Sequence, residues 1–313
     1  MAGPAISVII PARDAQATLP DTLEGLAGQE VDGGVEVIVV DDGSTDETAA
    51  VAERSPVVDQ VLRAGGDGPA RSRNLGAAAA SAPLLAFLDA DCRPASSWLA
   101  AGAAALAAAD LVIGQTRPRP DRPLGPFDRT LWVTWRSPLF ESANLFVRRD
   151  LFHALGGFES WLGPRGGKEL GEDVWFGWRA IRSGARAEYC PTALVHHEVF
   201  PRGPLGFVSE RWRLRFFPPM ARRMPELRDV LFYRRYFLTA RQARFDLALA
   251  GLVSARLARS PALAAAALPY AWTVSRDLRE PGGPSRAVAR TLADAVGFGA
   301  LVVGSSRSGT LLL

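Results

Sequence analysis

Short apolar runs alternate with helix-forming stretches through the first third of the chain. Ile6–Pro11 (ISVIIP) and Val35–Val40 (VEVIVV) are β-branched runs typical of strands, and Thr18–Gln29 between them has a helical pattern. This succession predicts a right-handed βαβ unit with parallel strands. Residues 1–115 are therefore expected to form an open α/β sheet, whose ligands gather at the carboxyl ends of its strands. The further expected elements are a helix at Asp46–Glu53, a strand at Asp59–Arg63, a helix at Ser72–Ala80 and a strand at Leu84–Leu88.

The pattern changes after residue 116. Arg117–Pro126 (RPRPDRPLGP) contains too much proline for a helix or a central strand, so we expect a loop there. Short strands, including one at Ala193–Val195, alternate with glycine-rich turns up to residue 200. The chain is therefore predicted to have three segments, 1–115, 116–200 and 201–313.

The start of the last segment is strongly basic. Arg202–Arg244 contains eleven arginines against three acidic residues, a local charge of +8 in a chain whose net charge is +3. Such a mixture of basic and aromatic side chains is expected where a helix lies on an anionic membrane surface, and an ordinary solvated helical face is the alternative. The interleaved aromatic residues are Phe207, Trp212, Phe216, Phe217, Phe232, Tyr233, Tyr236 and Phe237.

Two apolar stretches follow near the end of the chain. Phe245–Trp272 is interrupted by Arg256 and Arg259, and Leu292–Gly304 is short. Each uninterrupted run falls below the roughly 20 residues that span a bilayer, so none is expected to span. A helical hairpin dipping into one leaflet and an ordinary buried helical pair both fit this pattern.

Composition narrows the class of protein. A chain of 313 residues that is 48% hydrophobic and 22% charged can bury a sizeable core, and its near-balanced charge excludes a histone-like polycation. The two cysteines are too few for a disulfide scaffold, and no basic region precedes an apolar stretch at the N-terminus. We therefore expect a cytoplasmic location.

Carboxylates follow two of the predicted strands. Asp42, in the string VVDDGSTD, could accept hydrogen bonds from a base or a ribose, while Ser44 or Thr45 would cap the next helix. Asp89 and Asp91 follow LLAFL, and their dense negative charge would be offset by a divalent cation or by ribose hydroxyls. Simple aspartate-rich turns are the alternative at both places.

Three other strings carry candidate chemistry. Gly68–Gly76 (GPARSRNLG) brings arginines to a helix start, where they suit phosphate or sugar oxygens. Glu172 and Asp173 open another helix; the dipole alone could favour them there, or one could deprotonate an acceptor hydroxyl. His196 and His197 follow a predicted strand, as metal ligands or as structural histidines. No GxGxxG follows the first strand, which disfavours an NAD enzyme.

In their order along the chain, these strings resemble the family 2 glycosyltransferases of the GT-A fold. The resemblance covers roughly residues 5–200 and rests on ISVIIPARD, VVDDGSTDET, GPARSRNLG, FLDADC, NLFVRRDLFHALGGFES and GEDVWFGWRA. It implies a Rossmann-like, mostly parallel nucleotide-binding sheet flanked by helices, with a C-terminal helical extension. Residues 1–115 would bind the nucleotide sugar, 116–200 would form the acceptor-binding and catalytic half, and 201–313 would be membrane-associated.

The resemblance also implies roles for individual residues. Asp42 would hold the nucleobase, and Asp91 would be the direct ligand of Mn²⁺ or Mg²⁺. Asp173 would be the catalytic base, oriented with the help of Glu172, and His196 or His197 would make a late metal or diphosphate contact. The other implied donor-side residues are Pro11, Arg13, Arg71, Asn74, Asp89 and Ala90, and the acceptor-side residues are Asn144, Gly156, Gly157 and Trp175.

The implied activity is inverting, metal-dependent transfer of one sugar from a nucleotide sugar to an acceptor hydroxyl. A cell-envelope glycan or a lipid-linked acceptor at the inner face of a bacterial membrane is expected. The QxxRW-type motif of processive members is missing, since Ser209–Trp212 (SERW) lacks the glutamine. The main alternative is a non-catalytic GT-A-like nucleotide-binding scaffold protein at the membrane. A nucleotidyltransferase is disfavoured, because it would need a glycine-rich triphosphate loop after the first strand and ISVIIPARDAQ contains no glycine. Nucleic-acid binding is also disfavoured, because no recognised binding motif accompanies the arginines.

Overall fold

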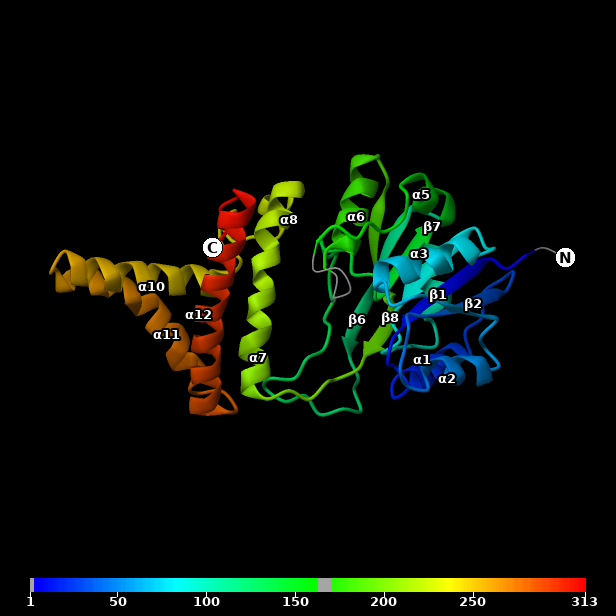
Figure 1. Cartoon of the computed structure of the whole chain (residues 1–313), viewed down its shortest axis with the longest axis horizontal. Helices are drawn as coiled ribbons and strands as arrows, with labels where there is room; N and C mark the ends of the chain where they lie inside the picture. Colours follow the sequence, from blue (N-terminus) through cyan, green and yellow to red (C-terminus); the bar gives the residue numbers. More distant parts are fainter. Residues whose placement is uncertain (1–2, 163–169) are drawn as a thin grey trace. The chain divides into compact units, whose positions relative to one another are not determined.

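The chain divides into two compact units, and the computed structural model describes residues 3–162 and 170–313. The sheet unit comprises Met1–Pro123 and Thr130–Val199, and the helical unit comprises Leu124–Arg129 and Phe200–Leu313. Figure 1 labels the elements of both units. The short segment 124–129 therefore belongs to the helical unit, although the residues before and after it in the sequence belong to the sheet unit.

A mixed sheet of eight strands, in the order β3-β2-β1-β4-β7-β6-β8-β5, forms the centre of the described part of the sheet unit. Strands β3, β2, β1 and β4 run parallel, whereas β7 is antiparallel to both β4 and β6. Strand β8 is parallel to β6 and antiparallel to β5. The predicted α/β sheet is confirmed, and its antiparallel members are additions to that prediction. The strands are β1 (Ile6–Ala12), β2 (Val35–Asp41), β3 (Gln60–Arg63), β4 (Leu84–Leu88), β5 (Cys92–Pro94), β6 (Leu111–Pro118), β7 (Asn144–Arg148) and β8 (Ala187–His197).

Helices flank this sheet. The three helices expected in the first segment are present, but α3 begins at Pro69 rather than Ser72. Proline suits the first helical position, and Gly68 before it has a φ of 101° that lets the chain turn into the helix. The helices are α1 (Leu19–Leu26), α2 (Thr48–Arg54), α3 (Pro69–Ala79), α4 (Trp98–Ala105), α5 (Arg149–Ala154) and α6 (Glu172–Arg182).

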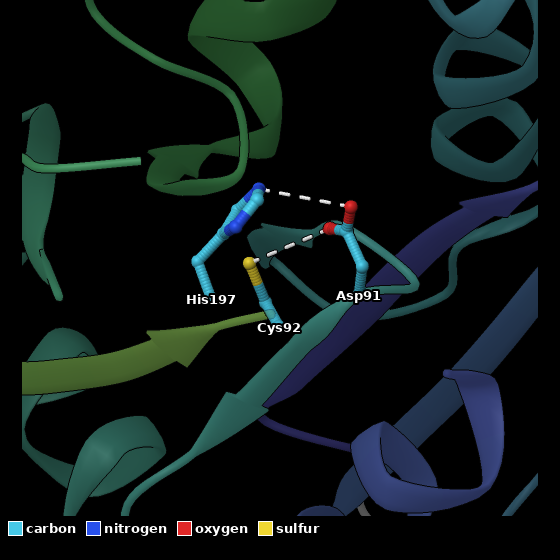
Figure 2. Close-up of side chains that lie close together, drawn as sticks. All are labelled: Asp91, Cys92 and His197. Carbon is cyan, nitrogen blue, oxygen red and sulfur yellow. Dashed lines mark hydrogen bonds and ion pairs between the residues drawn. The ribbon is translucent and has the colours of Figure 1, made fainter. Parts of the chain in front are cut away.

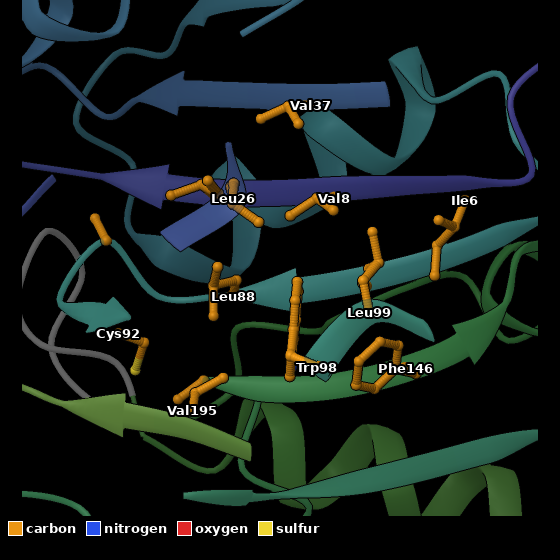
Figure 3. Packing of buried hydrophobic residues seen from close by; sticks show 14 of the residues in the cluster. Ile6, Val8, Leu26, Val37, Leu88, Cys92, Trp98, Leu99, Phe146 and Val195 are labelled. Atoms are coloured by element: carbon orange, nitrogen blue, oxygen red, sulfur yellow. The ribbon is translucent and has the colours of Figure 1, made fainter. Parts of the chain in front are cut away.

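An apolar core joins one face of the sheet to α1, α2 and α4 (Figure 3). Ile6, Val8 and Ile10 of β1 all enter this core, because alternate residues of a strand point to the same side. Trp98 of α4 is fully buried there, with its ring centroid 5.1 Å from that of Phe146 in β7. This packing holds the strands, and hence the loops at their ends, in a fixed register.

Four phenylalanines anchor α5 and α6 near β4. The centroids of neighbouring rings in this cluster are 5.0 to 5.2 Å apart. The four residues are Phe87 of β4, Phe152 of α5, Phe158 of the loop after α5, and Phe176 of α6. Such tilted and edge-to-face arrangements are favourable beyond the area that they bury. The aromatic cluster fixes the start of α6 relative to β4. Helix α6 carries the predicted catalytic pair Glu172 and Asp173 (the ED sequence), and β4 precedes Asp89 and Asp91 (the DxD sequence).

The strand ends that carry the candidate chemistry meet along one edge of the sheet. The carboxyl ends of β1, β2 and β4 share this edge because these strands are parallel. The antiparallel β7 begins there, since Asn144 pairs with Leu88. Strand β8 ends there, with His197 paired to Cys92.

The described elements of the helical unit are α-helices and 3-10 helices. Helix α10 is joined by η2 to α11, and these two helices and α12 contact one another. Helix α12 also packs on α7, η1 and α8. The elements are α7 (Pro204–Glu210), η1 (Arg211–Phe216), α8 (Phe217–Arg223), α9 (Leu227–Val230), α10 (Ala240–Leu257), η2 (Pro261–Ala267), α11 (Leu268–Asp277) and α12 (Gly283–Ser308).

Helix α12 is longer than the apolar run on which the expectation about spanning a bilayer rests. The apolar run Leu292–Gly304 is too short by itself to span a bilayer, yet it lies in a helix of 26 residues. Among the described residues, α12 is the one helix long and apolar enough to cross a membrane by length and composition. Core helices share these properties, and Gly304 of α12 packs against the Arg215 carbonyl with no space for a Cβ.

The arginines of the basic segment 202–244 make contacts within the helical unit. Arg222 and Arg228 donate to the carbonyls of Ser308 and Leu311, at 2.7 and 2.9 Å, and so hold the end of the chain. Arg215 lies over the ring of Phe216, with its Cζ 4.3 Å from the centroid. Much of the basic and aromatic character of this segment therefore serves the unit's own structure.

Candidate active site

Asp42 is buried at the end of β2 with half of its carboxylate satisfied. Its Oδ2 accepts a hydrogen bond from the Gly68 amide at 3.0 Å, whereas its Oδ1 has no partner among the described residues. Gly43 and Gly66 let the adjacent loops approach, since a Cβ on Gly43 would lie 3.2 Å from the Gly66 nitrogen. A buried carboxylate oxygen without a partner is costly, so a donor from a ligand such as a nucleobase N–H would stabilise it.

The loops after β1 and β2 are held together by polar side chains. Asp14 Oδ1 accepts hydrogen bonds from Thr45, through its amide at 2.8 Å and its hydroxyl at 3.1 Å. Ser44 Oγ accepts from the Asp14 amide at 3.0 Å. The prediction that Ser44 or Thr45 caps the next helix is wrong, because α2 starts at Thr48 and these side chains bind the neighbouring loop.

Arg73 of α3 bridges the two acidic motifs. Its side chain is only 5% exposed, and its Nη2 donates to Asp89 Oδ1 at 2.6 Å. Its Nη1 lies 3.5 Å from Glu172 Oε1 at the start of α6. Burial alone would lower the pKa of Arg73, but Asp89 and Glu172 outweigh that effect and raise it. A permanent cation therefore connects the DxD sequence to the ED sequence.

The sequence predicts that either His196 or His197 lies near Asp91, and in the structure it is His197 (Figure 2). His197 Nε2 lies 3.6 Å from Asp91 Oδ2, and Glu198 N donates to the Asp91 carbonyl at 2.8 Å. The Nδ1 of His197 lies 2.7 Å from the Glu198 carbonyl, which can only accept a hydrogen bond. A neutral ring that carries its proton on Nδ1 would donate to this carbonyl and direct the lone pair of Nε2 toward Asp91.

The neighbours of this pair have different surroundings. His196 lies on the opposite side of β8 from His197, with its Nδ1 3.4 Å from the Pro118 carbonyl, so it takes no part in the cluster. Cys92 contributes the third member, and its Sγ is 3.9 Å from Asp91 Oδ1 (Figure 2). Burial and the nearby Asp91 raise the pKa of the Cys92 thiol well above its ordinary value, which keeps it protonated.

Asp173 is half-buried at the first turn of α6. Its Oδ1 accepts from the Val174 amide at 2.8 Å and its Oδ2 from the Ser142 amide at 3.3 Å. Burial and the neighbouring Glu141 carboxylate raise the pKa of Asp173 to about 6, against an opposing effect of Arg73. A carboxylate with this pKa is ionised at neutral pH and is a much better proton acceptor than an ordinary aspartate.

Glu141 is a site residue that the sequence motifs do not reveal. Its Oε1 accepts from Ser137 Oγ at 2.8 Å, while its buried Oε2 has no partner among the described residues. Burial raises the pKa of Glu141 as well. No recognisable motif surrounds Glu141, and only the packing of its loop against α6 places the two carboxylates together.

Gly156, Gly157 and Asn74 form a structural joint between α3 and the loop after α5. Both glycines have positive φ values, 74° and 69°, which other residues adopt at a cost. A Cβ on Gly157 would lie 2.5 Å from Asn74 Oδ1. Asn74 accepts from the Phe158 amide at 2.9 Å and donates to its carbonyl at 2.7 Å. Asn74 was expected beside the nucleotide, and its amide is engaged in this joint instead.

Asn144 and Trp175, both expected on the acceptor side, differ in exposure. Asn144 is 1% exposed and its amide bonds to Trp98 Nε1, the Gln115 carbonyl and the Ala193 carbonyl. This full set of internal partners corrects the prediction, because no polar atom of Asn144 is left for a sugar. Trp175 Nε1 donates to Glu159 Oε2 at 2.7 Å, in an exposed position beside the ED pair.

The remaining predicted donor-side residues lie along the same sheet edge. Pro11 pairs with Val40 across β1 and β2, and Arg13 follows the end of β1. Arg71 is mostly exposed and pairs with Asp67 at 3.2 Å, so Arg73 rather than Arg71 reaches the centre of the site. The carbonyl of Ala90, between the DxD carboxylates, accepts from Thr22 Oγ1 at 3.1 Å.

The loop before β7 runs from the histidine to the predicted base and displays two tryptophans. Thr130 Oγ1 is 3.4 Å from His197 Nδ1, and Ser142 bonds to Asp173. Between these ends, Trp132 and Trp135 are 56% and 53% exposed. Tryptophan is usually largely buried, so two exposed indoles on a loop anchored at both ends to the site indicate a binding surface.

Comparison with known proteins identifies the family. The model of the family described as glycosyl transferase family 2 matches residues 7–162. The chain belongs to this family. It is therefore a glycosyltransferase, and the catalytic domain has the GT-A fold. The match ends before Glu172 and Asp173, so the roles of these two residues depend on the geometry described above.

Curated relatives agree with this membership, and solved structures agree with the fold. Glycosyltransferase AglE of Haloferax volcanii is 29% identical over 64% of this chain and 69% of its own length. The pre-mycofactocin glycosyltransferase of Mycobacterium tuberculosis is 30% identical over 62% of this chain, which spans only 42% of that protein. Mannosyltransferase PcManGT of Pyrobaculum calidifontis superimposes with a TM-score of 0.69 at 24% identity, over 96% of this chain and 87% of that one. Staphylococcus aureus TarS 1–349 gives 0.51 at 19% identity, over 98% and 92%.

Proposed function

We propose that this glycosyltransferase is an inverting, metal-dependent enzyme that moves a single sugar from a nucleotide sugar to an acceptor hydroxyl. The observation that carries the proposal is the buried bridge of Arg73 to Asp89 and Glu172, because it joins the donor-side and acceptor-side acids in one site. Residues 1–115 then serve the donor, 116–200 the acceptor and the chemistry, and 201–313 the membrane.

The proposed step is a direct displacement at the anomeric carbon. Asp173 accepts the proton of the acceptor hydroxyl as its oxygen forms a bond to that carbon from the side opposite the diphosphate. The bond to the diphosphate oxygen breaks, and its electron pair leaves with the nucleoside diphosphate. The raised pKa of Asp173 supports this role, since the carboxylate is ionised near neutral pH yet basic enough to take the proton.

Asp91, just before β5, and His197, at the end of β8, fit a divalent cation. Asp91 offers a carboxylate oxygen, and His197 offers the lone pair of Nε2 because its Nδ1 is occupied. A bound Mn²⁺ or Mg²⁺ would offset the negative charge that develops on the departing diphosphate. Two of the similar structures, PcManGT with GDP-Man and GalNAc-T7 with UDP and GalNAc, also contain Mn²⁺.

The acceptor is proposed to bind over Trp132 and Trp135. An indole face can stack on the apolar face of a sugar ring or on a hydrocarbon chain, and both indoles are on the loop that joins His197 to Asp173. The relatives' names mention acceptors as different as a polypeptide and 4,4'-diaponeurosporenoate. We propose a cell-envelope glycan or lipid-linked acceptor, used at the cytoplasmic face of the membrane.

Release of nucleoside diphosphate tests the proposal with no acceptor present. The full chain is incubated with a panel of sugar nucleotides and Mn²⁺ or Mg²⁺. We expect at least one donor to be hydrolysed slowly by the wild type, with Asp173→Asn lowering the rate by about 10²- to 10⁴-fold. Asp91→Ala should weaken metal binding, measured by calorimetry, as well as the rate.

Asp32→Asn is the matched control, because Asp32 lies on an exposed loop before β2. A chain that binds no donor with either metal would contradict the proposal. Full activity of Asp173→Asn would contradict the assigned base alone.

A further inference from the structure

An exposed apolar surface extends over α10, η2 and α11, and we refer to it as the hairpin surface. Leu257 is 80% exposed, Leu268 68% and Trp272 61%, values that are unusual for such large apolar side chains. Helix α10 and η2 pack closely, since a Cβ on Gly251 would lie 2.5 Å from the Ala266 Cβ. The exposed residues therefore belong to one packed hairpin (Figure 1). They are Leu247, Leu249, Leu252, Val253, Leu257, Leu263, Leu268, Trp272 and Leu278.

The charges on this hairpin have a single sign. Residues 240–279, which the structure describes throughout, contain two acidic residues, Asp246 and Asp277, and both are buried. Every exposed charged side chain in this range is an arginine. These are Arg244, Arg256, Arg259, Arg276 and Arg279.

One of these arginines occupies a position where glycine would be less strained. Arg259 follows the end of α10 with a φ of 51°, in the left-handed region. A non-glycine residue there costs roughly 1–2 kcal/mol. Arg259 therefore places its charge at the exposed helix end at a conformational cost.

We propose that the hairpin surface docks on an anionic lipid leaflet, with its leucines and Trp272 entering between the headgroups and its arginines meeting lipid phosphates. Basic and apolar residues on one surface suit this kind of interface. A second copy of the chain fits less well, because a two-fold interface would place arginines against arginines. Helix α10 lies on the leaflet rather than across it, since its uncharged run between Asp246 and Arg256 is only nine residues long.

This inference depends on the proposed membrane location but not on the proposed chemistry. It assigns the docking surface to residues 240–279, whereas the sequence pattern favours the basic segment 202–244 for this contact. The docking inference and the proposed chemistry can fail separately, because vesicle binding needs no sugar donor and donor hydrolysis needs no vesicle.

Vesicle flotation of the full chain tests the docking surface. Vesicles of phosphatidylcholine with phosphatidylglycerol are compared with vesicles of phosphatidylcholine alone. We expect the wild type to float with the anionic vesicles and to be released by salt. Arg256→Glu/Arg259→Glu should weaken binding at least about tenfold, because each basic residue near the surface contributes on the order of 1 kcal/mol.

Arg54→Glu/Arg186→Glu is the matched control, since it makes the same charge change at one helix end and one loop of the sheet unit. Equal weakening by both variants would overturn the proposal, because net charge rather than this surface would then drive binding. Failure of the wild type to float would also overturn it. Leu252→Asn/Leu257→Asn provides an apolar test. If it abolishes self-association in light scattering and leaves flotation unchanged, the surface is a contact between copies, and the proposal is wrong.

Discussion

The two units arrange their apolar side chains in opposite ways. Of the exposed large apolar side chains among the described residues, three lie in the sheet unit and nineteen in the helical unit. Both units contain buried ion pairs, and in the helical unit Arg241 contacts Asp277 and Asp294 at 2.7 Å and Arg290 contacts Asp277 at 2.6 Å. The sheet unit thus keeps nearly all of its large apolar side chains inside, whereas the helical unit exposes many of its own.

Buried charge serves a different purpose in each unit. In the sheet unit, Arg73 connects Asp89 and Glu172, which belong to the proposed active site. In the helical unit, Arg241 connects α10 to α11 and α12, where no feature of the described residues indicates chemistry. This difference leads to paired predictions, because equivalent substitutions should affect activity in one unit and only stability in the other.

The largest effect is expected for Arg73→Met. This variant keeps much of the side-chain volume but leaves Asp89 and Glu172 without their shared cation. We expect the free energy of unfolding to fall by about 3 kcal/mol, measured by urea denaturation, and nucleoside diphosphate release to be lost. Arg71→Met, at a largely exposed ion pair, is the control and should change stability by less than about 1 kcal/mol. Similar losses in both variants would contradict the bridge.

Asp277→Asn is the counterpart in the helical unit. The Asp277 side chain is 4% exposed and pairs with two arginines that are partly exposed. We expect the unfolding free energy to fall by about 2 kcal/mol, less than for Arg73→Met because water can reach the arginines. Donor hydrolysis without vesicles should remain at the wild-type rate. A loss of hydrolysis in a folded Asp277→Asn protein would show that the units are not functionally separate. Asp229→Asn, in an exposed pair with Arg235, serves as its control.

Glu141→Gln should change the pH dependence of activity. In the wild type, activity should fall as pH drops below about 6, because Asp173 becomes protonated. Removal of the Glu141 charge lowers the pKa of Asp173, so the acid limb of the pH–rate profile should move to lower pH. The readout is the profile of the rate at saturating donor, and an unchanged acid limb would show that Glu141 does not act on Asp173.

The smallest effect is expected for Asp246→Asn in α10. Burial raises the pKa of Asp246 to about 6, so the folded protein holds this proton more tightly than the unfolded chain does. The stability from this group is present at low pH and is lost as the pH rises toward 6. Asp246→Asn should therefore raise the unfolding free energy by about 1 kcal/mol above that pH and leave activity unchanged. Denaturation at acid and at neutral pH measures the difference, and a variant less stable than the wild type at neutral pH would contradict it.

Much of the site could be predicted because its residues follow strands in sequence. Asp42, Asp89 and Asp91 come directly after apolar runs, and parallel strands bring their carboxyl ends to one edge. Asp173 is the second residue of a helix that begins after Gly171, which is also visible in the sequence. In contrast, Asn144 belongs to a recognisable string, yet its amide is buried and fully bonded inside the sheet.

The sequence by itself determined the parallel strands β1 to β4, the family and the order of the acidic motifs, because these depend on local periodicity and on neighbours along the chain. Only the tertiary structure decided that His197 rather than His196 faces Asp91, that Arg73 joins Asp89 to Glu172, and that the Glu141 carboxylate neighbours Asp173. These contacts join residues far apart in the chain, or depend on which side of a strand a residue occupies. Burial and charge at such contacts arise from packing, which local sequence does not encode.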